Sequence, residues 1–277
     1  MFKDKYESLS QINKDIDEKF KARKKGSQEY YIVSRLKKHF EDDRALNKVI
    51  QISLPLIKVI NHPNILQLID FMEDSDYYYS IYEYCEGGSL ENYLEFLKEN
   101  NKTLNEEEVQ HIMKQLVEAV KYLHNKKIVH RDIKPRHLLI KYDSEEDLKK
   151  KNILKAKMKL TGFTISDQVK KGESLYLVAG TQAYMAPEIY GYKVYNEKVD
   201  IWSLGVIFSE LLSCNIKFNP KKPDYYHEGQ NFSNLSKEAN SFIQCMLRFE
   251  PEKRKGADEL SKHDFLIKEV KNFSFEK

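Results

Sequence analysis

The segment VDIWSLGVIFSELL, residues 199–212, constrains the fold of this chain most. Its apolar residues fall on nearly every side of a helix, so the helix must be buried all round rather than lie on a surface. Such a helix needs other elements packed about it, which places it at the centre of a core. With 277 residues, the chain is long enough for one large domain or for two lobes that share this core.

Further helices are predicted on both sides of this segment. In residues 105–124 the apolar positions recur at helical spacing after an asparagine that can cap the helix. Residues 236–247 open on a capping serine and are amphipathic as well. Residues 46–60 are another helix candidate, although Pro55 would normally disturb a helix interior.

The first third of the chain is rich in strand signals. EYYIVSRL (29–36) and YYYSIYEY (77–84) are runs of aromatic and β-branched residues bounded by turn signals. CEGGSL (85–90) carries a glycine pair and is the best candidate for a hinge. The sequence therefore predicts an α+β fold with a small strand-rich lobe and a larger, mainly helical lobe.

Composition excludes several classes of protein. The net charge is only +3, and no dense basic stripe interleaves with aromatic residues, so we expect no nucleic-acid partner. The three cysteines are too few and too far apart for a disulfide framework or a zinc site, which favours an intracellular location, expected to be the cytoplasm. The polar start and the lack of an apolar run near about 18 residues predict no signal peptide and no association with a membrane.

Six motifs, met in order along the chain, resemble those of eukaryotic protein kinases. They are HPNILQL (62–68), YEYCEGGSL (82–90), YLHNKKIVHRDIKP (122–135), GTQAYMAPE (180–188), VDIWSLGV (199–206) and PEKR (251–254). They resemble, in turn, the β4 entry, the hinge, the catalytic loop, the end of the activation segment, the central helix and the closing motif. Lys134, two residues after Asp132, resembles the serine/threonine branch rather than the tyrosine branch.

The resemblance covers essentially the whole chain and implies one bilobal, kinase-like domain over residues 1–277. Its N-lobe would span 1–84, its hinge 85–90 and its C-lobe 91–277. In such domains a glycine-rich loop and a strand β3 lysine hold the phosphates, and a helix glutamate pairs with the lysine. An aspartate of the catalytic loop orients the incoming hydroxyl, and an asparagine with the aspartate of Asp-Phe-Gly holds magnesium.

The phosphate-binding loop of that pattern is altered here. It should fall in INKDIDEKF (12–20), which has no glycine and carries Asp15, Asp17 and Glu18. Like charges about 4 Å apart repel by roughly 1 kcal/mol in water and by roughly 4 kcal/mol at an effective dielectric constant near 20. The loop is therefore predicted to repel phosphates.

The lysine–glutamate pair is missing as well. The β3 lysine position falls on Ser34, or on Val33 after a one-residue slip, and neither side chain is charged. The helix glutamate, counted back from His62, falls on Ser53. Both members of the pair are replaced, which is consistent with its loss as a unit.

The adenine pocket is predicted to be narrow. Ile32 or Tyr31 replaces the small alanine that normally forms its roof, and Tyr82 would be a bulky gatekeeper before the hinge. Together with the altered phosphate loop, this predicts no nucleotide cofactor.

The magnesium positions fail too. His137 stands where the asparagine is needed, five residues after Asp132, and Asp-Phe-Gly is replaced by Gly162-Phe163-Thr164. Magnesium takes hard oxygen ligands, usually one or two carboxylates plus phosphates. Imidazole and a glycine hydrogen do not supply them, so no metal is expected.

The residues that have structural roles in the kinase pattern are present in this chain. His130 and Phe163 resemble two members of the apolar spine that joins the lobes, with Ile57 and Leu68 above them. Glu188 and Arg254 resemble the buried ion pair that braces the large lobe, and Asp200 resembles the acid that anchors the backbone of the catalytic loop. The catalytic candidates that remain are Asp132 and Lys134, both expected to be vestigial, beside Arg131.

The pattern favours a kinase-fold pseudoenzyme that acts as a scaffold or allosteric partner of another protein, with little or no phosphotransfer. One alternative is an active serine/threonine kinase, using ATP and magnesium, in which Lys14, Lys19 or Lys21 replaces the missing lysine. Another is a nucleotide-binding switch without transfer. The candidate regulatory residues of the activation segment, Ser166, Ser174 and Tyr176, are taken as surface positions, and residues 141–159 as an exposed loop that offers a docking surface.

Overall fold

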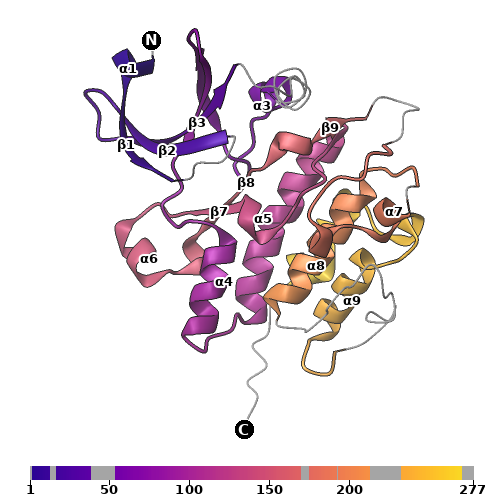
Figure 1. The fold of residues 1–277 in the computed structure, drawn as a ribbon. Helices are drawn as coiled ribbons and strands as arrows, with labels where there is room; N and C mark the ends of the chain where they lie inside the picture. Colours follow the sequence, from indigo (N-terminus) through magenta and orange to yellow (C-terminus); the bar gives the residue numbers. More distant parts are fainter. Residues whose placement is uncertain are drawn as a thin grey trace.

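A computed structural model describes residues 2–12, 17–38, 54–169, 175–191, 193–212 and 232–269. It contains a strand-rich N-lobe and a larger helical C-lobe, which Figure 1 shows one above the other. The α+β, bilobal fold predicted from the sequence is confirmed.

The N-lobe is built on a five-stranded sheet. Its strands, in spatial order, are β1 (Tyr6–Gln11), β2 (Asp17–Lys24), β3 (Tyr30–Lys37), β5 (Tyr77–Glu83) and β4 (Leu68–Glu73). Every neighbouring pair is antiparallel. The strands predicted over 29–36 and 77–84 are confirmed as β3 and β5.

The two faces of this sheet differ because side chains alternate along each strand. One face carries a small aromatic core that the N-terminal helix α1 (Phe2–Lys5) completes: the Phe2 ring stacks on Tyr79 with 4.8 Å between centroids. The core consists of Phe2, Tyr6, Phe20, Ala22, Tyr31, Val33, Tyr79 and Ile81. The alternate residues of β2, β3 and β5 therefore lie on the opposite face.

The predicted helix over 46–60 is described only in part. Helix α3 spans Leu54–Val59, and residues 46–53 lie outside the described residues. Pro55 is the second described residue of α3, and because the residues before Leu54 lie outside the described ranges, the disturbance expected from this proline stays a prediction.

The C-lobe is organised round α8 (Lys198–Leu211). Residues on every side of this helix are buried, and Trp202, Ile207 and Phe208 are fully so, as its composition predicted. Helices α5 (Glu106–Asn125) and α9 (Lys237–Met246) pack against it. Asn105 and Glu108 form the predicted capping box of α5, and Ser236 caps α9.

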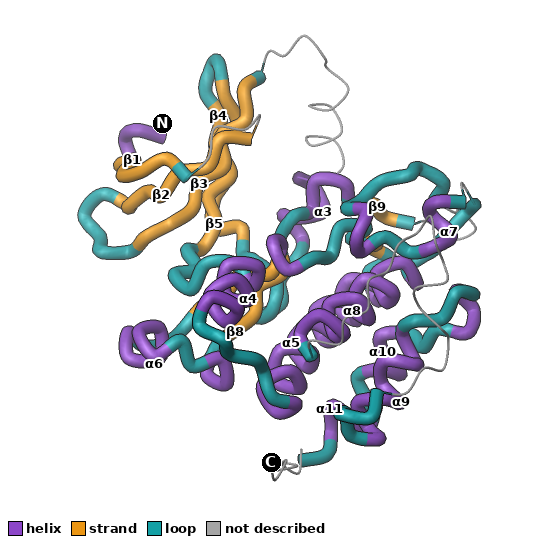
Figure 2. Tube along the Cα trace, turned by 60° about the horizontal axis from the view of Figure 1, so that its bottom comes forward, coloured by secondary structure: helices purple, strands orange, loops and turns teal. Residues whose placement is uncertain are grey.

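The remaining elements of the C-lobe are short. The helices are α4 (Leu90–Glu99), α6 (Glu145–Lys150), α7 (Pro187–Tyr190), α10 (Ala257–Leu260) and α11 (Asp264–Ile267). Strand β6 (Ile128–Val129) pairs with β9 (Asp167–Gln168), and β7 (Leu138–Lys141) pairs with β8 (Lys157–Leu160). Figure 2 shows that the helices of the C-lobe gather on one side of the molecule, apart from the large sheet.

Residues 141–159 are more ordered than predicted. The segment holds helix α6 and strand β8 instead of forming an exposed loop. Ser144 caps α6, and Lys150 at its end pairs with Glu146 at 2.6 Å. A capping serine followed by acidic and then basic residues is a helix signal that the charge-rich composition obscured.

The glycine-rich turn between β5 and α4 joins the lobes. The Gly87 N–H donates to the Ile140 carbonyl at 2.9 Å, and a Cβ on Gly87 would lie 2.7 Å from that oxygen. Gly88 has φ +73, which favours glycine. Both glycines are therefore required by the turn, although its role as a hinge and the exact lobe boundaries stay predictions.

None of the helices in the described ranges has the length and apolar content that crossing a bilayer requires.

Candidate active site

Strand β3 places two of its residues on the face of the sheet opposite the aromatic core. Ile32 lies opposite Tyr82 of β5, and Ser34 follows on the same face of the sheet. Val33 points to the other face, where it is fully buried in the aromatic core. Ser34 therefore shares a face with the gatekeeper candidate Tyr82, whereas Val33 does not. This favours Ser34 over Val33 as the lysine position and Ile32 over Tyr31 as the roof residue, and both assignments stay predictions.

Two of the three candidate replacement lysines lie on this face. Lys19 of β2 is the cross-strand neighbour of Ser34. Lys21 lies opposite Ile32, and its ammonium lies 4.0 Å from the ring centroid of Tyr30 and 4.4 Å from that of Tyr84. These cation–π contacts hold Lys21 near the hinge. Lys14 lies outside the described residues.

The acidic loop is only partly as expected. Glu18 is not free to repel phosphates, because Arg35 of β3 donates to its Oε2 atom, with Nε at 2.8 Å. Cross-strand pairs of opposite charge neutralise one another. Asp15 lies outside the described residues, so the strong repulsion predicted for the loop is not supported at Glu18 and stays a prediction at Asp15 and Asp17.

The catalytic loop brings Asp132 and Lys134 together with Thr181. The Thr181 hydroxyl donates to Asp132 Oδ1 at 2.6 Å, and Lys134 Nζ lies 3.0 Å from Asp132 Oδ2 and 2.5 Å from Thr181 Oγ1. Thr181 was missed as a site residue, although it stands in the GTQAYMAPE motif, directly after Gly180. A polar residue next to a glycine in a loop motif was the available signal.

The carboxyl group of Asp132 is held ionised. Burial by itself would raise its pKa, but the hydrogen bonds from Thr181 and Lys134 outweigh burial and lower the pKa below the ordinary value of 3.8. The aspartate is thus charged at neutral pH, whatever its role.

Asp200 anchors the backbone of the catalytic loop, as predicted. Its buried carboxylate accepts the backbone N–H of His130 at 2.9 Å and that of Arg131 at 2.8 Å. His124 Nε2 lies 2.9 Å from the same carboxylate. Burial would raise the pKa of Asp200, but these partners lower it. Arg131 adopts φ +70, and the two bonds to Asp200 hold it in that strained conformation.

Part of the predicted spine is present. The His130 ring packs edge-on against Phe163 with 4.8 Å between centroids, and its Nε2 atom donates to the Thr161 carbonyl at 2.9 Å. Ile57 packs against the large core. The place of Leu68 above them stays a prediction.

Arg131 links the two ends of the activation segment. Its guanidinium donates to the Ile165 carbonyl at 2.6 Å, to Asp167 at 3.2 Å and to the Tyr195 hydroxyl at 3.5 Å. The Tyr195 hydroxyl donates in turn to the Leu177 carbonyl at 2.6 Å. A carboxylate of the chain itself thus pairs with this buried arginine.

The three candidate regulatory residues of this segment differ in accessibility. Ser166 is fully buried, and its hydroxyl donates to the His130 carbonyl at 3.2 Å, so its expected surface position is wrong. Tyr176 is 76% exposed. Ser174 lies outside the described residues.

His137 and Gly162 fit one another closely. A Cβ on Gly162 would lie 2.4 Å from His137 Nδ1 and 2.5 Å from its Cγ, well inside van der Waals contact. The His137 ring thus fills the space that any larger side chain at position 162 would need. Because a carbonyl oxygen only accepts, Nδ1 carries the proton that it donates to the Asp132 carbonyl at 2.8 Å.

Burial lowers the pKa of His137 to about 4, although the backbone bond and the Asp132 carboxylate act in the opposite direction. The ring is therefore neutral at physiological pH. In the unfolded chain it would take up its proton near the ordinary value of 6.5. Between these two values the unfolded state binds more protons, so His137 makes stability fall as the pH falls from about 6.5 to about 4.

We expect His137→Gln to remove this part of the pH dependence. From pH 7 to pH 5 the wild-type protein should lose about 2 kcal/mol more unfolding free energy than the variant. Urea unfolding of both proteins at the two pH values measures the difference, and the other histidines cancel because both proteins contain them. Equal losses in the two proteins would contradict a buried, neutral His137.

The ion pair predicted to brace the C-lobe is present. Arg254 NH1 and NH2 lie 2.6 and 2.7 Å from the two carboxylate oxygens of Glu188, a bidentate contact. The side chains are 0% and 6% exposed.

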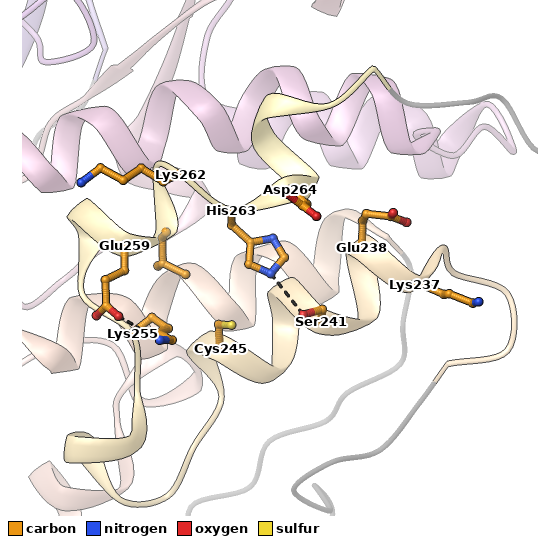
Figure 3. A pocket seen from close by; sticks show the side chains of 10 residues that line it. Lys237, Glu238, Ser241, Cys245, Lys255, Glu259, Lys262, His263 and Asp264 are labelled. Carbon is orange, nitrogen blue, oxygen red and sulfur yellow. Dashed lines mark hydrogen bonds and ion pairs between the residues drawn. The ribbon is translucent and has the colours of Figure 1, made fainter.

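A cavity of about 500 Å³ lies at the base of the C-lobe, away from these groups. Figure 3 shows charged side chains of α9 and of the segment from 255 to 264 around it, with Ser241 bonded to His263 at 3.2 Å. His263 Nδ1 accepts the Phe265 N–H at 3.1 Å, so its proton lies on Nε2, which donates to Ser241. The ring cannot remove a proton from this serine, and the pair is no activated nucleophile.

The fold and this arrangement of motifs are those of a protein kinase domain, and the family comparison agrees. The model of the protein kinase domain family matches residues 18–266. The chain therefore belongs to that family. The relatives that it resembles are named serine/threonine-protein kinases.

Three relatives illustrate the similarity. The chain is 32% identical over 230 residues to the serine/threonine-protein kinase atg1 of Dictyostelium discoideum, covering 80% of this chain and 32% of that protein. It is 31% identical over 242 residues to the ovarian-specific serine/threonine-protein kinase Lok of Drosophila melanogaster, covering 82% and 47%. With the serine/threonine-protein kinase ULK3 of Xenopus laevis it shares 29% over 253 residues, covering 88% and 51%. The matched part of the chain thus spans 32% to 51% of the length of these curated relatives.

Proposed function

We propose that this kinase domain is a pseudokinase: a scaffold or allosteric module that binds another protein and transfers little or no phosphate. The observation that carries the proposal is the fit of His137 against Gly162. The two residues stand at the two metal-ligand positions of the kinase pattern, and each suits the other rather than a metal.

The donor set supports this proposal. Magnesium prefers oxygen ligands in near-octahedral geometry. Gly162 has no side-chain donor, and the His137 ring is neutral, with its Nδ1 proton directed at the Asp132 carbonyl. The residues present therefore do not fit a magnesium ion held by the side chains at positions 137 and 162.

The nucleotide site gives further support. Ser34 supplies no charge for the phosphates, and Ile32 opposite Tyr82 takes up space at the roof. The groups that brace the lobe are complete by contrast, with Asp200 and the Glu188–Arg254 pair buried and bonded. The residues that brace the lobe are thus retained, while those at the phosphate-binding positions are altered. This contrast is consistent with a function that depends on the folded shape, and we propose another protein as the partner.

The proposal predicts no phosphotransfer above background. Metal ions contribute several kcal/mol of transition-state stabilisation, and each 1.36 kcal/mol is about tenfold in rate. Purified protein would be incubated with labelled ATP, magnesium and generic protein substrates, with Asp132→Asn as the matched variant. Incorporation that is present in the wild type and absent in Asp132→Asn would overturn the proposal.

The second candidate is an active serine/threonine kinase with a relocated lysine. Two observations favour it: Lys19 lies directly across from Ser34, and Asp132, Lys134 and Thr181 are assembled with both carboxylate oxygens of Asp132 engaged. The relatives are also named serine/threonine-protein kinases.

Lys19 makes this alternative testable. If the chain is active, Lys19→Met should abolish transfer, while Lys24→Met, at the far end of the same strand, should leave it intact. ATP with magnesium at about 100 times its dissociation constant should also stabilise the wild type by about 2.7 kcal/mol. If ATP with magnesium does not raise the melting temperature, both the hypothesis of an active kinase with a relocated lysine and that of a nucleotide-binding switch are contradicted.

A further inference from the structure

A second cavity, of about 440 Å³, lies on the C-lobe between the end of α4, the start of α5 and the segment that follows α6. Figures 1 and 2 both show α6 beside α4, away from the activation segment. The floor of the cavity is apolar, with Tyr93, Leu97, Leu104 and Ile153 all buried. Three exposed lysines, Lys102, Lys150 and Lys151, also line it and form its rim.

Two loops beside this cavity hold unusual backbone conformations. Lys151, the C-cap of α6, has φ +50, and Asn101 in the loop after α4 has φ +52. The left-handed region costs a residue with a side chain roughly 1–2 kcal/mol. In this conformation Lys151 Nζ lies 3.5 Å from the ring centroid of Phe96, while the Tyr93 hydroxyl donates to the Lys151 carbonyl at 3.4 Å. These contacts hold the ammonium group at the rim.

The charges at the rim are not balanced. Lys150 pairs with Glu146 at 2.6 Å, and the single lining carboxylate, Glu108, accepts the Asn105 N–H at 2.9 Å as part of the α5 cap. Within the described ranges, no carboxylate forms an ion pair with Lys102 or Lys151. Two lysines thus line a pocket with an apolar floor and have no ion-pair partner in the part of the chain that the structure describes.

We propose that this cavity, the Lys102–Lys151 pocket, is a docking site for an acidic segment of a partner protein that carries an apolar side chain beside its carboxylates. The proposal rests on the pseudokinase function and names the chemistry of the partner. The apolar side chain would lie on the buried floor while the carboxylates meet the two lysines. The volume suits a few side chains, since ligand pockets typically range from about 300 to 1,000 Å³.

The test is fluorescence anisotropy with a fluorescein-labelled peptide, Glu-Asp-Leu-Asp-Glu, titrated with the full chain. We expect saturable binding that weakens as salt is added, because ion pairs at a rim are screened. The double variant Lys102→Glu/Lys151→Glu should weaken binding at least tenfold. The matched control is Lys149→Glu, a neighbouring lysine that is 78% exposed, pairs with Glu145 and does not line the pocket, and it should change binding less than about twofold.

Several results would overturn the proposal. Absence of binding would exclude the site, and equal weakening by Lys149→Glu would indicate attraction by net charge alone. Equal binding of a peptide with glycine in place of leucine would indicate a simple anion site. Full displacement of the peptide by millimolar inorganic phosphate would indicate the same. Thermal unfolding of each variant checks the fold, and the milder Lys102→Ala should still weaken binding if the double variant is unstable.

The phosphotransfer assay on the same preparation separates the two proposals. Peptide binding together with Asp132-dependent transfer would overturn the pseudokinase and leave the docking site standing. Absence of both would overturn the docking site alone.

Discussion

Arg254→Ala is expected to destabilise the domain by about 3–5 kcal/mol, because it leaves the buried Glu188 carboxylate without its partner. The arginine also donates to the carbonyls of Arg248 at 2.7 Å and Phe249 at 3.2 Å, and these bonds would be lost as well. Urea unfolding measures the change. A loss below about 1 kcal/mol would contradict the bracing role of the pair.

An exposed ion pair provides the control. Lys262 and Asp258 lie 2.6 Å apart with side chains 70% and 59% exposed. Lys262→Ala should cost less than about 1 kcal/mol, because solvent screens such pairs. Replacing both buried partners, as in Glu188→Leu/Arg254→Met, should cost less than Arg254→Ala alone, because no unpaired charge is left in the core.

Comparison of Arg254→Ala with Asp132→Asn in the cell tests whether function depends on the folded shape or on the catalytic residue. In a pull-down from the native cell, Asp132→Asn should retain the protein partner, since the change barely alters size or packing. Arg254→Ala should lose the partner through loss of the fold. A folded Asp132→Asn protein that no longer binds its partner would count strongly against the scaffold function.

Gly162→Asp is expected to destabilise the domain by about 2–4 kcal/mol, combining backbone strain at φ +87 with overlap against the His137 ring. Gly26→Asp is the matched control. Gly26 has φ +76, yet a Cβ there would meet nothing within 4 Å, so only the strain contributes. The difference between the two variants isolates the steric overlap.

The overlap should be relieved by a smaller neighbour. In a double-mutant cycle, the loss of unfolding free energy in His137→Asn/Gly162→Asp should be about 1–2 kcal/mol smaller than the sum of the losses in the two single variants. Residues in contact are expected to show such a coupling. Chemical denaturation of the four proteins gives this coupling. A coupling near zero would show that the two residues do not depend on one another.

Local patterns predicted much of the frame. The strands over 29–36 and 77–84 and the helices at 105–124 and 236–247 follow from periodicity and capping, which depend on neighbours in sequence. The prediction failed where charged residues masked the helical pattern. Helix α6 (Glu145–Lys150) forms because Ser144 caps an acidic first turn, but the lysine run outweighed this signal in the sequence.

The functional groups were predictable only where a motif named them. Asp132, Lys134 and Asp200 stand in motifs and lie where those motifs imply. Thr181 reaches Asp132 across 49 residues, and Arg35 reaches Glu18 across 17, and neither distance has a periodic signature. The register of β3 also required the partner strand, because a one-residue slip moves every side chain to the other face.

The sequence by itself determined that the helix at 199–212 lies in the core, since a helix that is apolar on nearly every side must be buried. The six ordered motifs indicated a bilobal kinase-like domain through their resemblance to that family. The sequence also determined which chemical groups stand at the catalytic positions. Only the tertiary structure decided how those groups meet. Three features depend on distances between segments remote in sequence. The His137 ring fills the space beside Gly162, the charge of Glu18 is paired with that of Arg35, and Lys102 and Lys151 line one cavity. Such distances are set by packing of the whole core, and no local pattern encodes them.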